Sequence, residues 1–152
     1  MMAKGSCLCG EVTYKFSGTP ALQALCHCAP CHKISGSTYT TNLLIPVQNF
    51  TVLTGSDNLR SFSMQHPSDL TLTVHFCVKC GTKIYKEGTA KGFKGVVIVQ
   101  AGTLDGGIGD GMGDARDEMG LGDVVVGAEL WVKERVDWVP RRREVAQMEE
   151  FS

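Results

Sequence analysis

The stretch Cys26-His27-Cys28-Ala29-Pro30-Cys31 brings three thiols together with no fourth cysteine beside them. One pair of thiols precedes it, Cys7-Leu8-Cys9, and another follows it, Cys77-Val78-Lys79-Cys80. A closed structural zinc site takes four protein ligands, whereas a catalytic zinc site takes three and keeps one position for water or substrate. The 7 cysteines of the chain therefore divide naturally into four and three.

This division predicts two zinc sites with different tasks. The outer pairs are expected to hold a structural zinc through Cys7, Cys9, Cys77 and Cys80. The central trio is expected to hold a catalytic zinc with one open position through Cys26, Cys28 and Cys31. Two alternatives remain: Cys7 and Cys9 could join the trio, or His27 or His32 could close the second site. Each histidine adjoins a ligand cysteine, so its side chain should diverge from the metal.

Three thiolates on Zn²⁺ leave a net charge of −1, so the metal should activate water weakly. Such a site suits a substrate thiol, which loses its proton on binding and remains nucleophilic. His27 and His32 are candidates for carrying a proton, whereas no role is expected for His66 or His75.

Composition indicates an ordinary globular chain. With 152 residues, 43% hydrophobic content and a net charge of −1, one domain is expected, without a nucleic-acid partner. The start carries no apolar run typical of a signal peptide, and no stretch approaches the roughly 20 apolar residues of a membrane span. A reducing cytoplasmic location follows, which favours metal-bound thiols over disulfides. Redox-active thiols at Cys26 to Cys31 remain a minor alternative.

The hydrophobic pattern predicts a mainly β fold. Short strands joined by turns are expected over 11–16, 39–47, 50–54, 59–64, 70–76, 82–86, 96–101, 124–126 and 128–132. One short helical turn is expected over 29–35, because Pro30 suits its first position and Gly36 suits its end.

Two segments interrupt this pattern. Residues 105–123 are rich in glycine and acidic side chains and are interpreted as a mobile surface loop. The ligand spacing of a calcium-binding EF-hand is absent there. Residues 141–152 form a polar tail, interpreted as solvated and partly helical, and Arg141 to Arg143 are the only basic cluster.

Three motifs carry a resemblance to a known family. They are Gly5-Ser6-Cys7-Leu8-Cys9-Gly10-Glu11-Val12-Thr13-Tyr14, Cys26-His27-Cys28-Ala29-Pro30-Cys31 and Phe76-Cys77-Val78-Lys79-Cys80-Gly81-Thr82. Together they resemble the glutathione-dependent formaldehyde-activating enzyme family, which includes centromere protein V. The resemblance continues into 101–105 and 129–133 and covers roughly residues 5–138. The sequence departs from the family in two places. His32 puts a titratable side chain where a residue with a fixed positive charge is common, and the 105–123 loop is longer than usual.

The resemblance implies a β-tent fold of small antiparallel sheets around a structural zinc, in a domain over 1–140. It also implies the two zinc ligand sets named above. The implied reaction joins glutathione to formaldehyde as S-hydroxymethylglutathione, which classes the enzyme as a carbon-sulfur lyase in the reverse direction. The implied partners are a small-molecule thiol and an aldehyde, with no membrane. The alternative function is a non-enzymatic zinc scaffold of the centromere protein V type.

Overall fold

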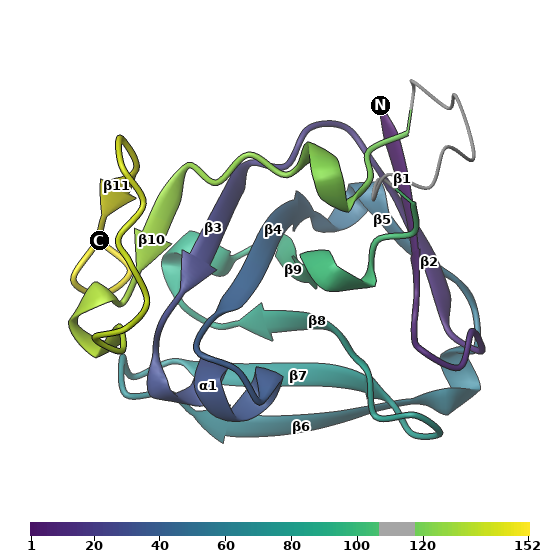
Figure 1. The fold of residues 1–152 in the computed structure, drawn as a ribbon. Helices are drawn as coiled ribbons and strands as arrows, with labels where there is room; N and C mark the ends of the chain where they lie inside the picture. Colours follow the sequence, from purple (N-terminus) through teal and green to yellow (C-terminus); the bar gives the residue numbers. More distant parts are fainter. Residues whose placement is uncertain (107–117) are drawn as a thin grey trace.

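The computed structural model describes residues 1–106 and 118–152, whose strands form two sheets beside one α-helix (Figure 1). The smaller sheet is antiparallel and has the order β1-β2-β5. Its strands are β1 (Met2–Ser6), β2 (Thr13–Ser17) and β5 (Phe50–Thr54). The helix α1 spans Ala29–Ser35, as predicted, and ends at Gly36 in the left-handed conformation.

The larger sheet has the order β11-β10-β3-β4-β9-β8-β7-β6. Its strands are β3 (Leu22–Cys26), β4 (Thr40–Pro46), β6 (Leu59–Gln65), β7 (Thr71–Cys77), β8 (Lys83–Gly88), β9 (Val96–Gln100), β10 (Ala128–Leu130) and β11 (Ala146–Gln147). Neighbouring strands are antiparallel except at β10, which pairs parallel with both β3 and β11. The prediction of a mainly β, largely antiparallel fold is confirmed.

Short 3-10 turns join several of these strands. They span Val47–Asn49, Ser56–Asn58, Lys91–Phe93, Ala101–Thr103, Leu121–Asp123 and Val132–Glu134. In the described part of the chain, no helix is long and apolar enough to cross a membrane.

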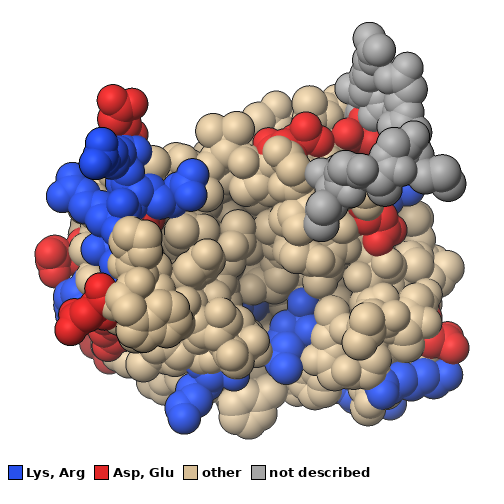
Figure 2. Space-filling view, in the orientation of Figure 1, with Lys and Arg blue, Asp and Glu red and all other residues tan. Residues whose placement is uncertain are grey.

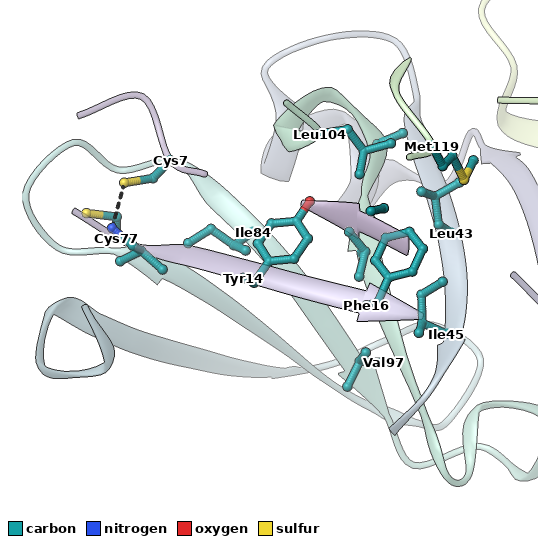
Figure 3. Close-up of a cluster of buried hydrophobic side chains, with 14 residues drawn as sticks. Cys7, Tyr14, Phe16, Leu43, Ile45, Cys77, Ile84, Val97, Leu104 and Met119 are labelled. Atoms are coloured by element: carbon teal, nitrogen blue, oxygen red, sulfur yellow. Dashed lines mark hydrogen bonds between the residues drawn. The ribbon is translucent and has the colours of Figure 1, made fainter. Parts of the chain in front are cut away.

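The main core lies between the small sheet and the middle of the large one (Figure 3). In β2, Tyr14 and Phe16 are buried while Lys15 between them is exposed, as the alternation of the strand predicts. These rings pack with buried aliphatic side chains of β4 and β9, and each large apolar side chain contributes roughly 1.5–3 kcal/mol. Gly5 is required beside Tyr14, because a Cβ built there would lie 2.2 Å from the ring.

A second core cluster surrounds the central cysteines. It contains Cys26, Cys28 and Cys31 together with Ala24 of β3, Ala128 and Leu130 of β10, and Trp131. The parallel pairing of β3 with β10 therefore places the thiol trio in the hydrophobic interior.

Two expectations about the C-terminal part are wrong. Residues 124–126 form no strand, because Val125 is exposed and its backbone N–H bonds the Gln23 side chain instead of a neighbouring strand. The tail is not helical: it contains β11, and half-buried Phe151 packs against the second cluster. Strands β1 and β3 were not predicted.

The predicted loop over 105–123 is described only at its ends, and residues 107–117 lie outside the described residues. The Asp105 backbone N–H bonds the Lys4 carbonyl at 2.9 Å, and that of Met119 bonds the Met2 carbonyl at 2.8 Å. Met119 is buried in the main core. Both ends are thus attached to β1.

Candidate metal centres

The four outer cysteines meet at one end of the main core. Cys7 and Cys9 lie in the turn after β1, whereas Cys77 ends β7 and Cys80 lies in the turn before β8. Their four sulfurs all lie within 4.8 Å of one another, with Cys7 Sγ and Cys9 Sγ 3.5 Å apart. The alternative in which Cys7 and Cys9 join the central trio is therefore wrong.

Local backbone geometry builds this cluster. The Gly81 N–H donates to the Cys77 carbonyl at 2.7 Å, and Gly81 adopts a φ of 75° that favours glycine. The Val12 N–H donates to Cys7 Sγ at 3.3 Å, an interaction that suits a thiolate. These turns point the sulfurs toward a common centre, as the Cys-x-x-Cys-Gly sequence predicts.

Thr82 stabilises the thiolate form of Cys80 through hydrogen bonds. Its hydroxyl lies 3.2 Å from Cys80 Sγ and also accepts a hydrogen bond from the Leu8 N–H at 3.0 Å, so its own proton is free for the sulfur. Hydrogen bonds from the Thr82 side chain and backbone lower the pKa of Cys80 to about 5. At neutral pH this sulfur is a thiolate, the form that binds metal.

The central trio comes from the junction between β3 and α1. Cys26 ends β3, Cys28 immediately precedes the helix and Cys31 lies inside it. The three sulfurs lie within 4.8 Å of one another, and each residue is at most 2% exposed. Pro30 in the first turn of α1 fixes the backbone between the second and third sulfurs.

Two side chains that were not predicted contact Cys31. The Thr40 hydroxyl, on β4, donates to Cys31 Sγ at 3.1 Å. The Lys86 ammonium, on β8, lies 3.6 Å from the same sulfur and 3.4 Å from the Thr40 hydroxyl. Lys86 is only 2% exposed. Its place two residues after buried Ile84 was the available sequence signal, because alternate residues of a strand share a face.

The trio favours one thiolate before any metal binds. Contacts with Cys26 and Cys28, followed by Lys86 and Thr40, hold the pKa of Cys31 well below its usual value. The pKa of Cys26 is raised by its contacts with the other two thiols and by burial. Since metal ligation requires deprotonated thiols, a divalent cation would replace the protons that these buried sulfurs otherwise share.

The histidines lie elsewhere than the closed-site alternative requires. In the described residues, no histidine nitrogen belongs to the group of atoms around the trio. His27 is fully buried, and its Nε2 is hydrogen-bonded to Glu129 Oε1 at 2.8 Å. Closure of the second site by His27 or His32 is therefore wrong for this arrangement. Either residue as a proton carrier stays a prediction.

A small cavity of about 30 Å³ adjoins the trio. Its walls are largely apolar, with Lys86 and His66 as its basic side chains. The sequence did not indicate that His66 lies beside this cavity. His66 is 2% exposed, and burial lowers the pKa of its imidazole. The other cavity residues are Cys26, Cys28, Cys31, Asn42, Leu44, Leu70, Leu72, Phe93, Ile98, Leu130 and Phe151.

A larger groove of about 440 Å³ lies on the other side of Thr40. It is open, and Ser35, Lys83, Gln100 and the turn at Gly81 contribute polar groups to its walls. Figure 2 shows that the face carrying α1 is hollowed near its middle, with lysine or arginine atoms at the base of the hollow. Thr40 therefore lies between a surface groove and the Cys31 sulfur.

Comparisons with known proteins give a family for the sequence and a relative for the fold. The sequence pattern of a family described as "Glutathione-dependent formaldehyde-activating enzyme" matches residues 2–118, which include all the cysteines. The match leaves out Glu129, Trp131 and Phe151. A crystal structure of a Rhodobacter sphaeroides protein is similar with a TM-score of 0.54 at 20% identity, covering 75% of this chain and 93% of that one. This second likeness concerns the fold alone.

Proposed function

The chain belongs to the glutathione-dependent formaldehyde-activating enzyme family, and from that premise we propose that it adds a thiol to a small aldehyde at the Cys26, Cys28 and Cys31 cluster. The proposed reaction is glutathione plus formaldehyde to S-hydroxymethylglutathione, or a close relative of it. In the reverse direction the enzyme is a carbon-sulfur lyase. The observation that carries this proposal is a trio of buried sulfurs facing a small cavity, with no fourth protein ligand among the described residues.

The donor sets fit two zinc ions. A tetrahedral zinc with bonds of about 2.3 Å places its sulfurs roughly 3.8 Å apart. The Cys9 and Cys77 sulfurs are 3.8 Å apart, which supports a structural zinc in the outer cluster. A zinc held by the trio would supply a Lewis acid that lowers the pKa of an incoming thiol.

The surrounding residues have tasks of their own. Thr40 orients Cys31 through its hydroxyl hydrogen bond, and the Lys86 ammonium offsets part of the negative charge of the thiolates. In the reaction, a carbon-sulfur bond forms, the carbonyl π pair moves to oxygen, and the thiol proton ends on that oxygen. We assign Lys86 as the hydrogen-bond donor to the developing alkoxide, because it lines the cavity and is charged. The groove beyond Thr40 is the proposed place for the rest of the thiol.

The test is direct observation of hemithioacetal formation by NMR exchange, with ¹³C-formaldehyde and glutathione as substrates of the zinc-loaded protein. A screen of other thiols and aldehydes defines the substrate range. The exchange rate should rise above the uncatalysed rate and return to it in Cys28→Ser, while Val78→Ala, an exposed change in the outer turn, should leave it raised. Absence of acceleration for every pair would contradict the proposal and favour a zinc scaffold.

A further inference from the structure

The C-terminal segment lies against the central trio although the family match ends at residue 118. Strand β11 pairs with β10, and the backbone pairing continues past the end of β11. The Val132 N–H donates to the Met148 carbonyl at 3.0 Å, and the Trp131 N–H donates to the Glu150 carbonyl at 3.0 Å. The backbone of the segment is therefore fixed as far as residue 150.

The buried carboxylate of Glu129 forms hydrogen bonds with the same segment. Glu129 is fully buried, and its Oε2 accepts a hydrogen bond from Gln147 Nε2 at 2.6 Å and one from the Arg142 backbone N–H at 3.0 Å. Bonds to an ionised acceptor are about twice as strong as neutral ones. Glu129 thus holds both the connection after β10 and the strand that leads to Phe151.

Phe151 ends this segment among aromatic rings. Its ring centroid lies 5.1 Å from that of Phe93, 5.3 Å from that of His66 and 5.8 Å from that of Trp131. The rings of Phe93 and Trp131 meet it nearly edge to face, an arrangement that aromatic pairs favour. Phe151, Phe93 and His66 also line the cavity beside the trio. One wall of that cavity is therefore supplied by the C-terminal segment.

The cavity leaves little room beside the sulfurs. Its volume is about 30 Å³. A single water molecule needs roughly 10–15 Å³ of such cavity volume, so the cavity holds about two groups of the size of a water molecule. Formaldehyde has one carbon and one oxygen, whereas each further carbon of a longer aldehyde would meet an apolar wall.

We propose that Phe151 is a specificity-determining residue, which sets the size of the carbonyl compound that can reach Cys26, Cys28 and Cys31. The inference rests on the proposed function for the identity of the substrate, and on the cavity geometry for the role of the ring. Phe151→Ala removes the wall, whereas Phe151→Trp extends it.

The experiment compares these two variants with Trp138→Ala, which changes an exposed aromatic residue that does not line the cavity. Circular dichroism and thermal melting establish that each purified full-length protein is folded. Alkylation of the trio by iodoacetamide and by the bulkier N-ethylmaleimide is followed by mass spectrometry. The kcat/KM values for formaldehyde and butanal are then measured with glutathione.

Phe151→Ala should speed N-ethylmaleimide labelling and raise butanal kcat/KM relative to formaldehyde by about tenfold or more. Phe151→Trp should slow labelling by both reagents, and Trp138→Ala should match the parent protein. If the alkylation rates of the Phe151 variants change as expected but no aldehyde is turned over, the result supports Phe151 as a wall of the cavity. That result contradicts only the proposed function. Unchanged labelling and unchanged selectivity in both folded Phe151 variants would overturn the inference, while turnover of formaldehyde would leave the proposed function standing.

Discussion

Replacing Lys86 by Met removes a buried positive charge beside the trio and keeps a side chain of similar length. The Lys86 ammonium is 3.6 Å from Cys31 Sγ. At an effective dielectric constant of about 20, two unit charges at that separation attract by roughly 5 kcal/mol. Desolvation of the ammonium opposes part of this attraction. We therefore expect Lys86→Met to remove about 1.5–3 kcal/mol of thiolate stabilisation from Cys31 in the zinc-free protein, the range for hydrogen bonds to charged groups.

This loss corresponds to roughly ten- to hundredfold less Cys31 thiolate at any pH below the pKa of that thiol. The assay is the rate of Cys31 alkylation by iodoacetamide in zinc-free protein over a series of pH values, followed by mass spectrometry. Lys83→Met is the matched control, because it removes the same charge from an exposed position on the same strand. Alkylation of Cys80 in the four-cysteine cluster should be unchanged in both variants.

Equal effects of Lys86→Met and Lys83→Met on the alkylation of Cys31 would refute this reasoning. Faster alkylation of Cys31 at low pH in Lys86→Met would refute it as well, since it would mean that the ammonium does not stabilise the thiolate.

Three further predictions address stability. Cys28→Ser should abolish turnover and keep the fold, whereas Cys80→Ser should lose the structural zinc and, with it, on the order of 10 kcal/mol of folding free energy; equal loss of circular dichroism in both variants would contradict the two roles. Glu129→Gln should lower the free energy of unfolding by about 1.5–3 kcal/mol at pH 7, as measured in urea. Burial opposes ionisation of Glu129, but its hydrogen bonds, beginning with that from Gln147, lower its pKa. The difference in free energy of unfolding between the parent protein and Glu129→Gln should therefore reach its full size above the ordinary pKa of a glutamate in the unfolded chain. It should vanish as the pH falls through the lower pKa of Glu129 in the folded state. A difference that stays constant with pH would contradict the role of the ionised Glu129. Gly5→Ala should cost about 1–3 kcal/mol, read from thermal melting, because the added methyl group overlaps Tyr14; an unchanged melting temperature would show that the ring moves freely.

Local chemistry made much of the fold predictable. Pro30 and Gly36 bound α1 because one suits a first helical turn and the other a left-handed end. Alternating side chains marked β2 and β7, and the spacing of the cysteines separated the two groups that the structure assembles. These signals depend on neighbours in sequence, so they are readable without the fold.

The rest depends on pairings between distant segments. Lys86 and Thr40 reach Cys31 because β8 and β4 both pair with β9, and no local pattern encodes that order. The tail looked like a solvated terminus because its composition is polar. Its position follows from Glu129, a charged residue inside a short strand, whose partners in the tail, Arg142 and Gln147, lie 13 and 18 residues away.

The central claim is that one zinc is held by four cysteines and another by three, with an exchangeable fourth ligand. Zinc-edge X-ray absorption on fully loaded protein, recorded before and after addition of glutathione, measures this directly. We expect 7 protein sulfurs shared by two zinc ions, and one additional sulfur after the thiol is added. Two ions fully coordinated by the protein from the start, with a spectrum that glutathione does not change, would contradict it.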